Sequence, residues 1–347
     1  MGRYMEKEKF DKAVGLLVYY GKTDTDGLRR RVNATIARNR RKKLRLRMMA
    51  SAAAILLLVV AGGVWLQTGR KNGDAIVRVS DDVVLTLPDG SQVILGHSAG
   101  TELIAEQDNV AIIHDGGRLL CKRSEEDATT QATIFNNVTV PKGSRFDIVL
   151  EDGTRVWLNA DSRLRFPTGF AGGERRVYLE GEAYFDVTQD VARPFVVETP
   201  QQTLQVLGTE FNIYAYPDEA VIYTTLVTGS VALSSKATGA ETKLEPGHQA
   251  RLSDGGYSVG RVNVDEVSAW REGMFVFDGN TLELVFRKLS HWYDFEYSFD
   301  DARTSALLLV GEMPMYDDIE RILKLIESSG QVDIERKGKK IHVRMKR

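Results

Sequence analysis

The residue types that most often carry chemistry are present in this chain, but their spacing matches no metal-binding pattern. Its histidines are scattered, and none lies four residues from another or next to the single cysteine, Cys121. A zinc site needs such spacing because its ligands must converge on one ion. The histidines are His97, His114, His248, His291 and His342. We therefore expect no metal site, no cofactor and no disulfide framework.

Two glutamates come closest to a catalytic pair. Glu180 and Glu182 flank Gly181 in a segment with strand character, so both point to one face if the chain is extended. Glycosidases use paired carboxylates, and Trp157 could stack on a sugar ring. Solvent-facing strand positions for the glutamates and a core or inter-sheet position for the tryptophan explain the same residues. With no GxSxG, GxxxxGK[ST] or GxGxxG motif, we expect a protein that is not an enzyme.

The distribution of charge separates a basic arm from an acidic body. The whole chain is nearly neutral, at −2. Residues 1–47 nevertheless hold 15 Lys or Arg against 5 Asp or Glu, and the remaining 300 residues hold 31 against 43. A basic tail can bind nucleic acid, but the aromatic or glycine-rich interleaving of single-strand binders is missing. We expect no direct contact with nucleic acid.

An uncharged apolar run from Met48 to Leu66 follows this arm, with Ser51 its only polar side chain. As a helix, it extends about 28 Å at about 1.5 Å per residue, which just spans a bilayer core. The basic residues before the run orient it with the N-terminus in the cytoplasm. They include Arg40, Arg41, Lys42, Lys43, Arg45 and Arg47. A cleaved signal peptide and a buried helix are alternatives, but the leading segment is long and its basic block lacks acidic compensation.

Within the arm, residues 6–20 predict an amphipathic helix, and a second short helix follows a turn at 21–27. The apolar stripe of the first helix consists of Phe10, Ala13, Val14, Leu17 and Tyr20, widened by Leu16 and Tyr19. A piece of fewer than about 50 residues cannot enclose such a stripe by itself. The stripe therefore implies a partner or self-association, and a weakly folded helical hairpin near the bilayer surface is the alternative.

Residues 74–260 have the pattern of an all-β domain, with short apolar runs separated by Asp-Gly, Gly-Gly and Pro-Gly turns. The stretch Leu85–Leu95 reappears at Ile148–Leu158 with the same central Asp-Gly pair. Weaker echoes occur at Asp115-Gly116 and Asp254-Gly255. Asp-Gly between alternating strands indicates a hairpin, because glycine accepts the positive φ of such turns. We expect repeated hairpins that form a solenoid-like domain or a sandwich.

From about Val267 the pattern changes to a small α+β domain in the order βαββαββ. Strands are expected at 275–277, 295–299, 307–310, 332–334 and 341–343. One helix begins near Asn280-Thr-Leu-Glu283, a cap-like start, and another begins near residue 317 and ends at Gly330. The apolar face of the first helix consists of Leu282, Val285, Phe286, Leu289 and Trp292 or Tyr293. We expect one small sheet with both helices on one face.

The predicted β-domain contains VTVPKGSRFDIVLEDGTRVWLNADSRLRFP at 138–167, RVYLEGEAYFDV at 176–187 and VLGTEFNI at 206–213. These stretches resemble the signature of FecR-type transmembrane anti-sigma regulators, and the resemblance covers most of 135–255. Residues 268–345 resemble the C-terminal domain that accompanies this family in Bacteroidetes-like proteins, which is similar to the secretin and TonB short N-terminal domain.

The resemblance implies a multidomain protein of the inner membrane that crosses it once, with its C-terminus in the periplasm. Its parts are a cytoplasmic helical sigma-binding segment (1–47), a transmembrane helix (48–66), a juxtamembrane β-rich region (67–134), a FecR all-β domain (135–262) and a C-terminal α+β signalling domain (268–347).

The implied partners lie on both sides of the membrane. An extracytoplasmic-function sigma factor would contact Phe10, Leu16, Leu17, Tyr19 and Tyr20. The N-terminal signalling domain of a TonB-dependent outer-membrane transporter would deliver the signal, and regulated proteolysis could release the sigma-binding segment. Residues 306–312 and 340–345 are candidate edges for strand addition. A membrane-tethered periplasmic carbohydrate-binding or carbohydrate-cleaving protein and a scaffold that links the two membranes are the rival interpretations.

Overall fold

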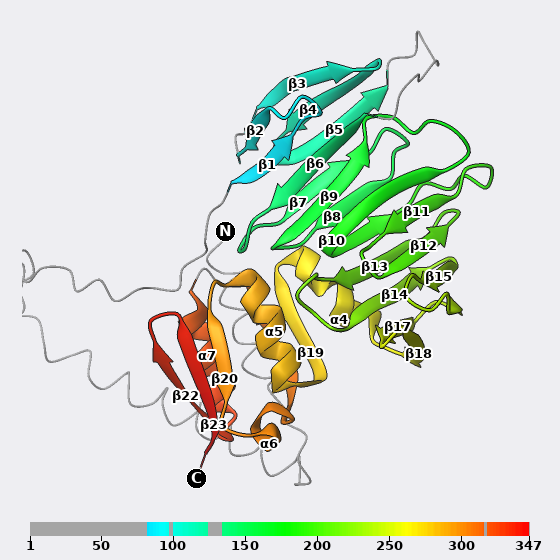
Figure 1. Cartoon of the computed structure of the whole chain (residues 1–347). Helices are drawn as coiled ribbons and strands as arrows, with labels where there is room; N and C mark the ends of the chain where they lie inside the picture. Colours follow the sequence, from blue (N-terminus) through cyan, green and yellow to red (C-terminus); the bar gives the residue numbers. More distant parts are fainter. Residues whose placement is uncertain (1–81, 97–99, 124–133, 316–317, 347) are drawn as a thin grey trace, which may run out of the picture.

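The computed structural model describes residues 82–96, 100–123, 134–315 and 318–346 (Figure 1). The predicted cytoplasmic segment and the predicted transmembrane helix lie outside these ranges. Among the helices that are described, none is both long and apolar enough to cross a membrane. We call residues 83–261 the β-domain, residues 262–273 the linker and residues 274–346 the C-terminal module.

In the described residues of the β-domain, 18 strands are present. They are β1 (Val83–Thr86), β2 (Gln92–Leu95), β3 (Thr101–Gln107), β4 (Val110–Asp115), β5 (Arg118–Arg123), β6 (Phe135–Val140), β7 (Phe146–Val149), β8 (Arg155–Leu158), β9 (Ser162–Pro167), β10 (Arg175–Asp186), β11 (Phe195–Glu198), β12 (Gln202–Val206), β13 (Glu210–Ala215), β14 (Ile222–Thr228), β15 (Val231–Ser235), β16 (Glu241–Leu244), β17 (His248–Ser253) and β18 (Gly256–Arg261).

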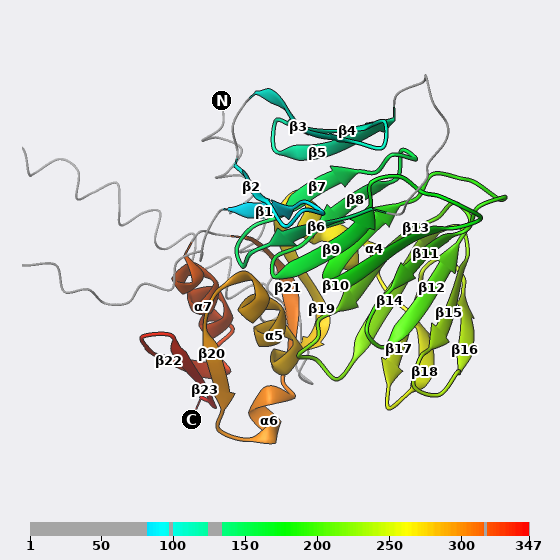
Figure 2. The same ribbon diagram turned by 45° about the horizontal axis from the view of Figure 1, so that its top comes forward.

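These strands form two sheets that share β10 (Figures 1 and 2). The first sheet has the order β2-β1-β6-β9-β10-β11-β12-β15-β16, and the second has the order β3-β4-β5-β7-β8-β10-β13-β14-β17-β18. Nearly all pairs are antiparallel, as hairpin connections require. The β-domain is therefore a sandwich built from successive hairpins.

Strand β10 passes from one sheet to the other at Gly181. Its first half pairs with β9 and β11, and its second half pairs with β8 and β13. Gly181 has a φ of +102°, and a Cβ there would lie 2.7 Å from the backbone Cα of Ser162. Only glycine fits this corner, because it has no Cβ and tolerates positive φ.

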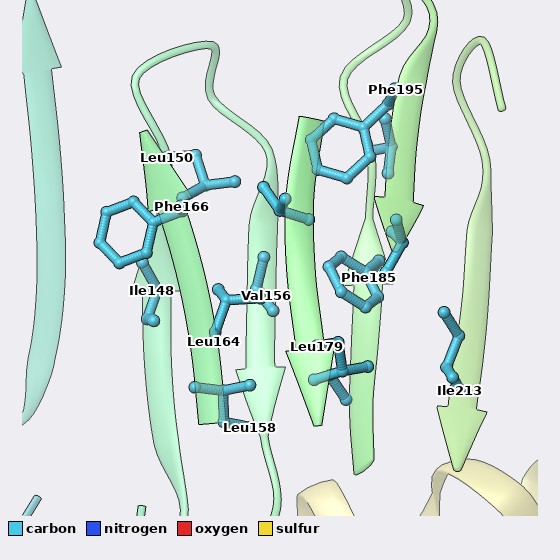
Figure 3. Packing of buried hydrophobic residues seen from close by; sticks show 14 of the residues in the cluster. Ile148, Leu150, Val156, Leu158, Leu164, Phe166, Leu179, Phe185, Phe195 and Ile213 are labelled. Carbon is cyan, nitrogen blue, oxygen red and sulfur yellow. The ribbon is translucent and has the colours of Figure 1, made fainter. Parts of the chain in front are cut away.

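One hydrophobic core fills the space between the sheets. Along β7, β8 and most of β9, buried positions alternate with half-buried or exposed ones, as expected for strands with one face in a core. Figure 3 shows Phe185 near Phe195, and the Phe185 and Phe211 rings stack at 5.0 Å. Val83, from the predicted juxtamembrane region, belongs to the same core. The expected boundary between residues 134 and 135 therefore does not separate two cores.

The repeated Asp-Gly turns have the predicted geometry. In the β1–β2 hairpin, the Leu87 amide donates to the Ser91 carbonyl at 2.9 Å, and in the β7–β8 hairpin the Leu150 amide donates to the Thr154 carbonyl at 2.9 Å. In the second hairpin, the Asp152 carboxylate also accepts from the Thr154 amide at 3.0 Å. The sequence repeat is therefore a structural repeat, although its two copies lie in different sheets.

The linker contains α4 (Val264–Ser268) and the short 3-10 helix η2 (Ala269–Glu272), and the C-terminal module follows. The module consists of β19 (Met274–Thr281), α5 (Leu282–Trp292), β20 (Glu296–Phe299), α6 (Ala302–Ser305), β21 (Leu308–Pro314), α7 (Ile319–Ser328), β22 (Val332–Lys337) and β23 (Lys340–Met345). Apart from the short α6, this is the predicted order. Thr281 caps α5, since its side chain accepts from the Leu284 amide, and Gly330 follows α7 with a φ of +79°.

The expectation of a single sheet in the module was wrong. Strands β19 and β21 form one antiparallel pair, whereas β20, β23 and β22 form a separate sheet. Helix α5 packs on β19 and β21, and α7 packs on β22, so the helices lie between the two sheets (Figures 1 and 2). Each helix carries a narrow apolar stripe. The β19–β21 pair lies on one side of the helices and the three-stranded sheet on the other, so both stripes are buried in the module core.

Candidate functional site

The residues predicted to bind a sigma factor lie outside the described residues. They are Phe10, Leu16, Leu17, Tyr19 and Tyr20. The same is true of the basic residues predicted to orient the membrane helix. The described part of the chain instead directs attention to the junction where the linker and the C-terminal module cover the outer face of the second sheet.

The outer face of the second sheet is polar and aromatic. Ala183 and Phe185 point into the sandwich core, so the alternate β10 residues Glu182 and Tyr184 point outward. On β13, the same alternation directs Asn212 outward. The outer face is nevertheless buried, since Glu182 is only 8% exposed and Asn212 only 2%. Such side chains need hydrogen-bond partners inside the protein.

Glu182 is at the centre of this buried polar group. Its carboxylate accepts from the Asn159 amide group at 2.7 Å and from the Asn212 amide group at 2.9 Å. Burial raises the pKa of Glu182, although the charge of Lys288 and the two amide hydrogen bonds oppose the rise. The expected solvent-facing position is therefore wrong for Glu182, while Glu180 is exposed and pairs with Arg163 at 3.5 Å.

Because β10 changes sheets at Gly181, Glu180 and Glu182 do not share a face. Glu180 pairs with β9 in the first sheet, and Glu182 pairs with β13 in the second. The two carboxylates therefore do not form the convergent pair that glycoside hydrolysis requires.

Trp157 lies on the outer face of the second sheet and is half-buried, so the expected core position is wrong. The Arg271 guanidinium from the linker lies 5.0 Å from the centre of the Trp157 ring and 3.6 Å from that of Tyr184. These are cation–π distances. A face covered in this way is not the open aromatic platform that sugar stacking needs.

The linker is anchored beside this cluster through Trp270, which is 6% exposed. Its indole nitrogen donates to the Asn212 side-chain oxygen at 3.3 Å, and its carbonyl accepts from the Arg145 guanidinium. Ala160 of the β-domain packs into the hydrophobic core of the C-terminal module. The module is thus attached to the sandwich by buried contacts as well as by the chain itself.

His291, near the end of α5, contacts the β-domain through the face of its ring and through both ring nitrogens. Its ring stacks on Tyr216, with centroids 3.5 Å apart and planes 10° apart. Nε2 lies 2.8 Å from a Glu219 carboxylate oxygen, and Nδ1 lies 3.2 Å from an Asp161 carboxylate oxygen. Tyr214 donates to the same Glu219 oxygen. We call His291, Tyr216, Asp161 and Glu219 the clasp.

Burial disfavours the charged form of His291, but its hydrogen bonds to Asp161 and Glu219 and the negative charge around it outweigh this effect. The pKa of His291 is therefore raised. Next to the clasp is a cavity of about 320 Å³, lined in part by Glu182, Lys288 and Trp270. Among the described residues, no group of His, Cys, Asp and Glu side chains is arranged to hold a metal ion.

One of the two candidate edges for strand addition is not an edge. Strand β23, which spans residues 340–345, lies in the middle of its sheet, between the parallel strand β20 and the antiparallel strand β22. The sequence could not reveal the β20 pairing, because the two strands are far apart in the chain. The other candidate edge, residues 306–312, overlaps β21 (Leu308–Pro314), which pairs only with β19 within the described residues.

These features define a class of protein in which an all-β sandwich carries a small α+β module on a buried polar junction. Residues 136–232 match the family model described as FecR protein, and residues 274–343 match the model described as FecR, C-terminal. The chain therefore belongs to the FecR-type anti-sigma factors.

Solved structures agree with this assignment. Two crystal structures of a provisionally assigned anti-sigma factor from Parabacteroides distasonis ATCC 8503 resemble the chain, each with a TM-score of 0.56. One is 28% identical and its match covers 61% of this chain and 99% of that chain, and the other is 27% identical, with 61% and 100% covered. No curated protein matches the chain.

Proposed function

We propose that this FecR-type protein binds an extracytoplasmic-function sigma factor through residues 1–47 and controls its release. In this proposal, the apolar run at 48–66 crosses the inner membrane once, and the β-domain and C-terminal module lie in the periplasm. A TonB-dependent outer-membrane transporter supplies the signal through its N-terminal signalling domain. The order of the parts carries the proposal: a basic arm, an apolar run, a FecR domain and a FecR C-terminal domain.

The physical argument for sigma binding is the apolar stripe of residues 6–20. A helix with one apolar face is stabilised when that face enters a groove on a partner, and a sigma factor offers helical surfaces of this kind. The basic residues at 38–47 fit a position next to the inner leaflet. The junction supports a role for the C-terminal module in signalling, since buried contacts couple the module to the sandwich.

Leu17→Asp is expected to weaken sigma-factor binding by the full chain at least about tenfold, because a charge on the apolar stripe would be buried without a partner. Binding is measured by co-purification and titration with the sigma factor encoded nearby. Val18→Asp is the matched control, since it makes the same change of charge at a position outside the stripe and its widening residues, on the side of the helix that carries Asp11, and it is expected to retain binding.

If Leu17→Asp binds as tightly as the parent, the contact lies elsewhere in the arm. If the complete arm captures no sigma factor and its deletion leaves transcription unchanged, the proposed function is wrong. Binding or turnover of a glycan by the full chain would favour the carbohydrate interpretation, although the separated glutamates and the covered face of Trp157 offer it no support.

A further inference from the structure

The clasp joins three separate parts of the fold. Asp161 lies between β8 and β9, Glu219 lies between β13 and β14, and His291 belongs to α5. His291 is 5% exposed, and the Glu219 side chain is 4% exposed, so this part of the contact is shielded from water. An interaction between charges weakens little with salt in such a position and depends strongly on whether each group is charged.

The geometry of the clasp requires a particular protonation state of His291. Both ring nitrogens face carboxylate oxygens, at 2.8 Å and 3.2 Å. An ionised carboxylate can only accept hydrogen bonds, whereas a neutral imidazole has a single N–H group. Only the doubly protonated ring donates to both Asp161 and Glu219. Loss of one proton would leave a ring-nitrogen lone pair facing either the buried Glu219 carboxylate or the Asp161 carboxylate, whose side chain is 43% exposed, and both arrangements lose a hydrogen bond.

We propose that the clasp is a proton-operated latch, in which protonated His291 holds the C-terminal module on the β-domain and deprotonation loosens the module. This goes beyond the proposed function, since it requires neither a sigma factor nor a transporter. It assigns to the junction a regulatory property of its own, namely that the stability of the docked arrangement depends on the pH around the β-domain.

Other charged groups near the clasp limit how much docking of the C-terminal module weakens when His291 loses its proton. On α5, the Arg287 guanidinium lies 3.5 Å from the second Glu219 oxygen, so Glu219 keeps one cationic neighbour when His291 is neutral. Lys288, also on α5, lies near Glu182. On the β-domain, Lys142 and Arg163 act on Asp161, and Asp218 adds negative charge near His291. Deprotonation is therefore expected to weaken docking without abolishing it.

The direction of the pH dependence follows from the raised pKa of His291 in the docked state. The docked state binds a proton more tightly than the released state, whose histidine has an ordinary pKa of about 6.5. The contribution of the clasp is complete below that ordinary pKa. It is lost as the pH rises through the raised value of the docked state.

The test measures docking in the full chain by energy transfer between two dyes. Cysteines replace the exposed residues Lys243 on β16 and Arg303 on α6. The native Cys121 is buried, with its pKa raised to about 12, and is expected to stay unlabelled in the folded protein. The urea concentration at which energy transfer is lost is compared at about pH 5.5 and about pH 8.5, on either side of the usual histidine range.

The parent is expected to lose energy transfer at a lower urea concentration at the higher pH, and His291→Gln is expected to show a much smaller shift. His342→Gln is the matched control, because His342 pairs with Asp300 at 2.7 Å on an exposed surface, and it should retain the parental shift. An undiminished shift in His291→Gln would overturn the proposal. So would an NMR titration of the parent in which His291 has an ordinary or lowered pKa, a measurement that needs no variant.

Discussion

Arg175→Met is expected to destabilise the β-domain by about 3–5 kcal/mol, because it removes one member of a buried ion pair and leaves the other charged. The Arg175 side chain is 0% exposed and contacts the Asp152 carboxylate at 2.8 Å. It also donates to the carbonyls of Thr188 and Arg193, at 2.7 Å and 2.9 Å. Urea unfolding of the full chain, followed by tryptophan fluorescence, measures the loss.

Two further variants separate the burial of this ion pair from ion pairing in general. Arg163→Met removes an exposed ion pair with Glu180, whose side chain is 47% exposed, and should change stability by less than about 1 kcal/mol. Adding Asp152→Asn to Arg175→Met removes the stranded charge and should restore part of the loss. Equal effects of Arg175→Met and Arg163→Met would contradict this account.

Gly181→Ala is expected to cost about 3 kcal/mol or more, since two separate penalties add at the corner of β10. A residue with a Cβ is strained at a φ of +102° by about 1–3 kcal/mol. The new methyl group would also lie 2.7 Å from the Ser162 Cα, and this backbone atom can move only if β9 moves. Overpacking of this kind costs about 1–3 kcal/mol. Thermal unfolding and the yield of folded full chain provide the measurement.

Gly90→Ala is the matched control for the corner. Gly90 has a φ of +84° in the β1–β2 turn, and a Cβ there would meet no atom within 4 Å. The Gly90→Ala variant should lose only the stability that a positive φ costs an alanine, about 1–2 kcal/mol. If the two alanine variants lose the same stability, close packing against Ser162 is not what requires glycine at the corner.

Local patterns in the sequence predicted much of this fold. The Asp-Gly pairs predicted hairpins because the turn needs positive φ over only two residues, a requirement met within the segment itself. The cap at Thr281 and the glycine after α7 are equally local signals. The order of strands and helices in the C-terminal module followed from their distinct periodicities.

The positions that could not be predicted depend on contacts between distant segments. Strand periodicity placed Glu180 and Glu182 on one solvent-facing surface, and this failed because Gly181 ends the alternation. An isolated glycine inside a long strand pattern was the available signal, since such a residue often marks a bulge or a close backbone approach. Likewise, parallel pairing with β20 placed β23 at the centre of its sheet, and no local pattern records that pairing.

The clasp was missed for the same reason. His291 is separated from Glu219 by 72 residues and from Asp161 by 130, so a search for ligands or catalytic groups at short spacing could not bring them together. The helix pattern assigned Trp292 or Tyr293 to an apolar face and left His291 without a role. A histidine beside the apolar face of a helix, within an otherwise acidic body, is the one signal that the sequence contains.

Sharing β10 between the sheets has a mechanical consequence for the sandwich. In a sandwich held only by side-chain packing, the two layers can slide past each other without breaking any backbone hydrogen bond. Here each half of β10 is hydrogen-bonded on both edges, and the halves belong to different layers. Sliding must therefore break these bonds or bend the strand at Gly181. A load applied where Arg271 of the linker lies on Tyr184 enters the same strand that carries Arg175 at its first residue, so tension on the junction is delivered to both layers together.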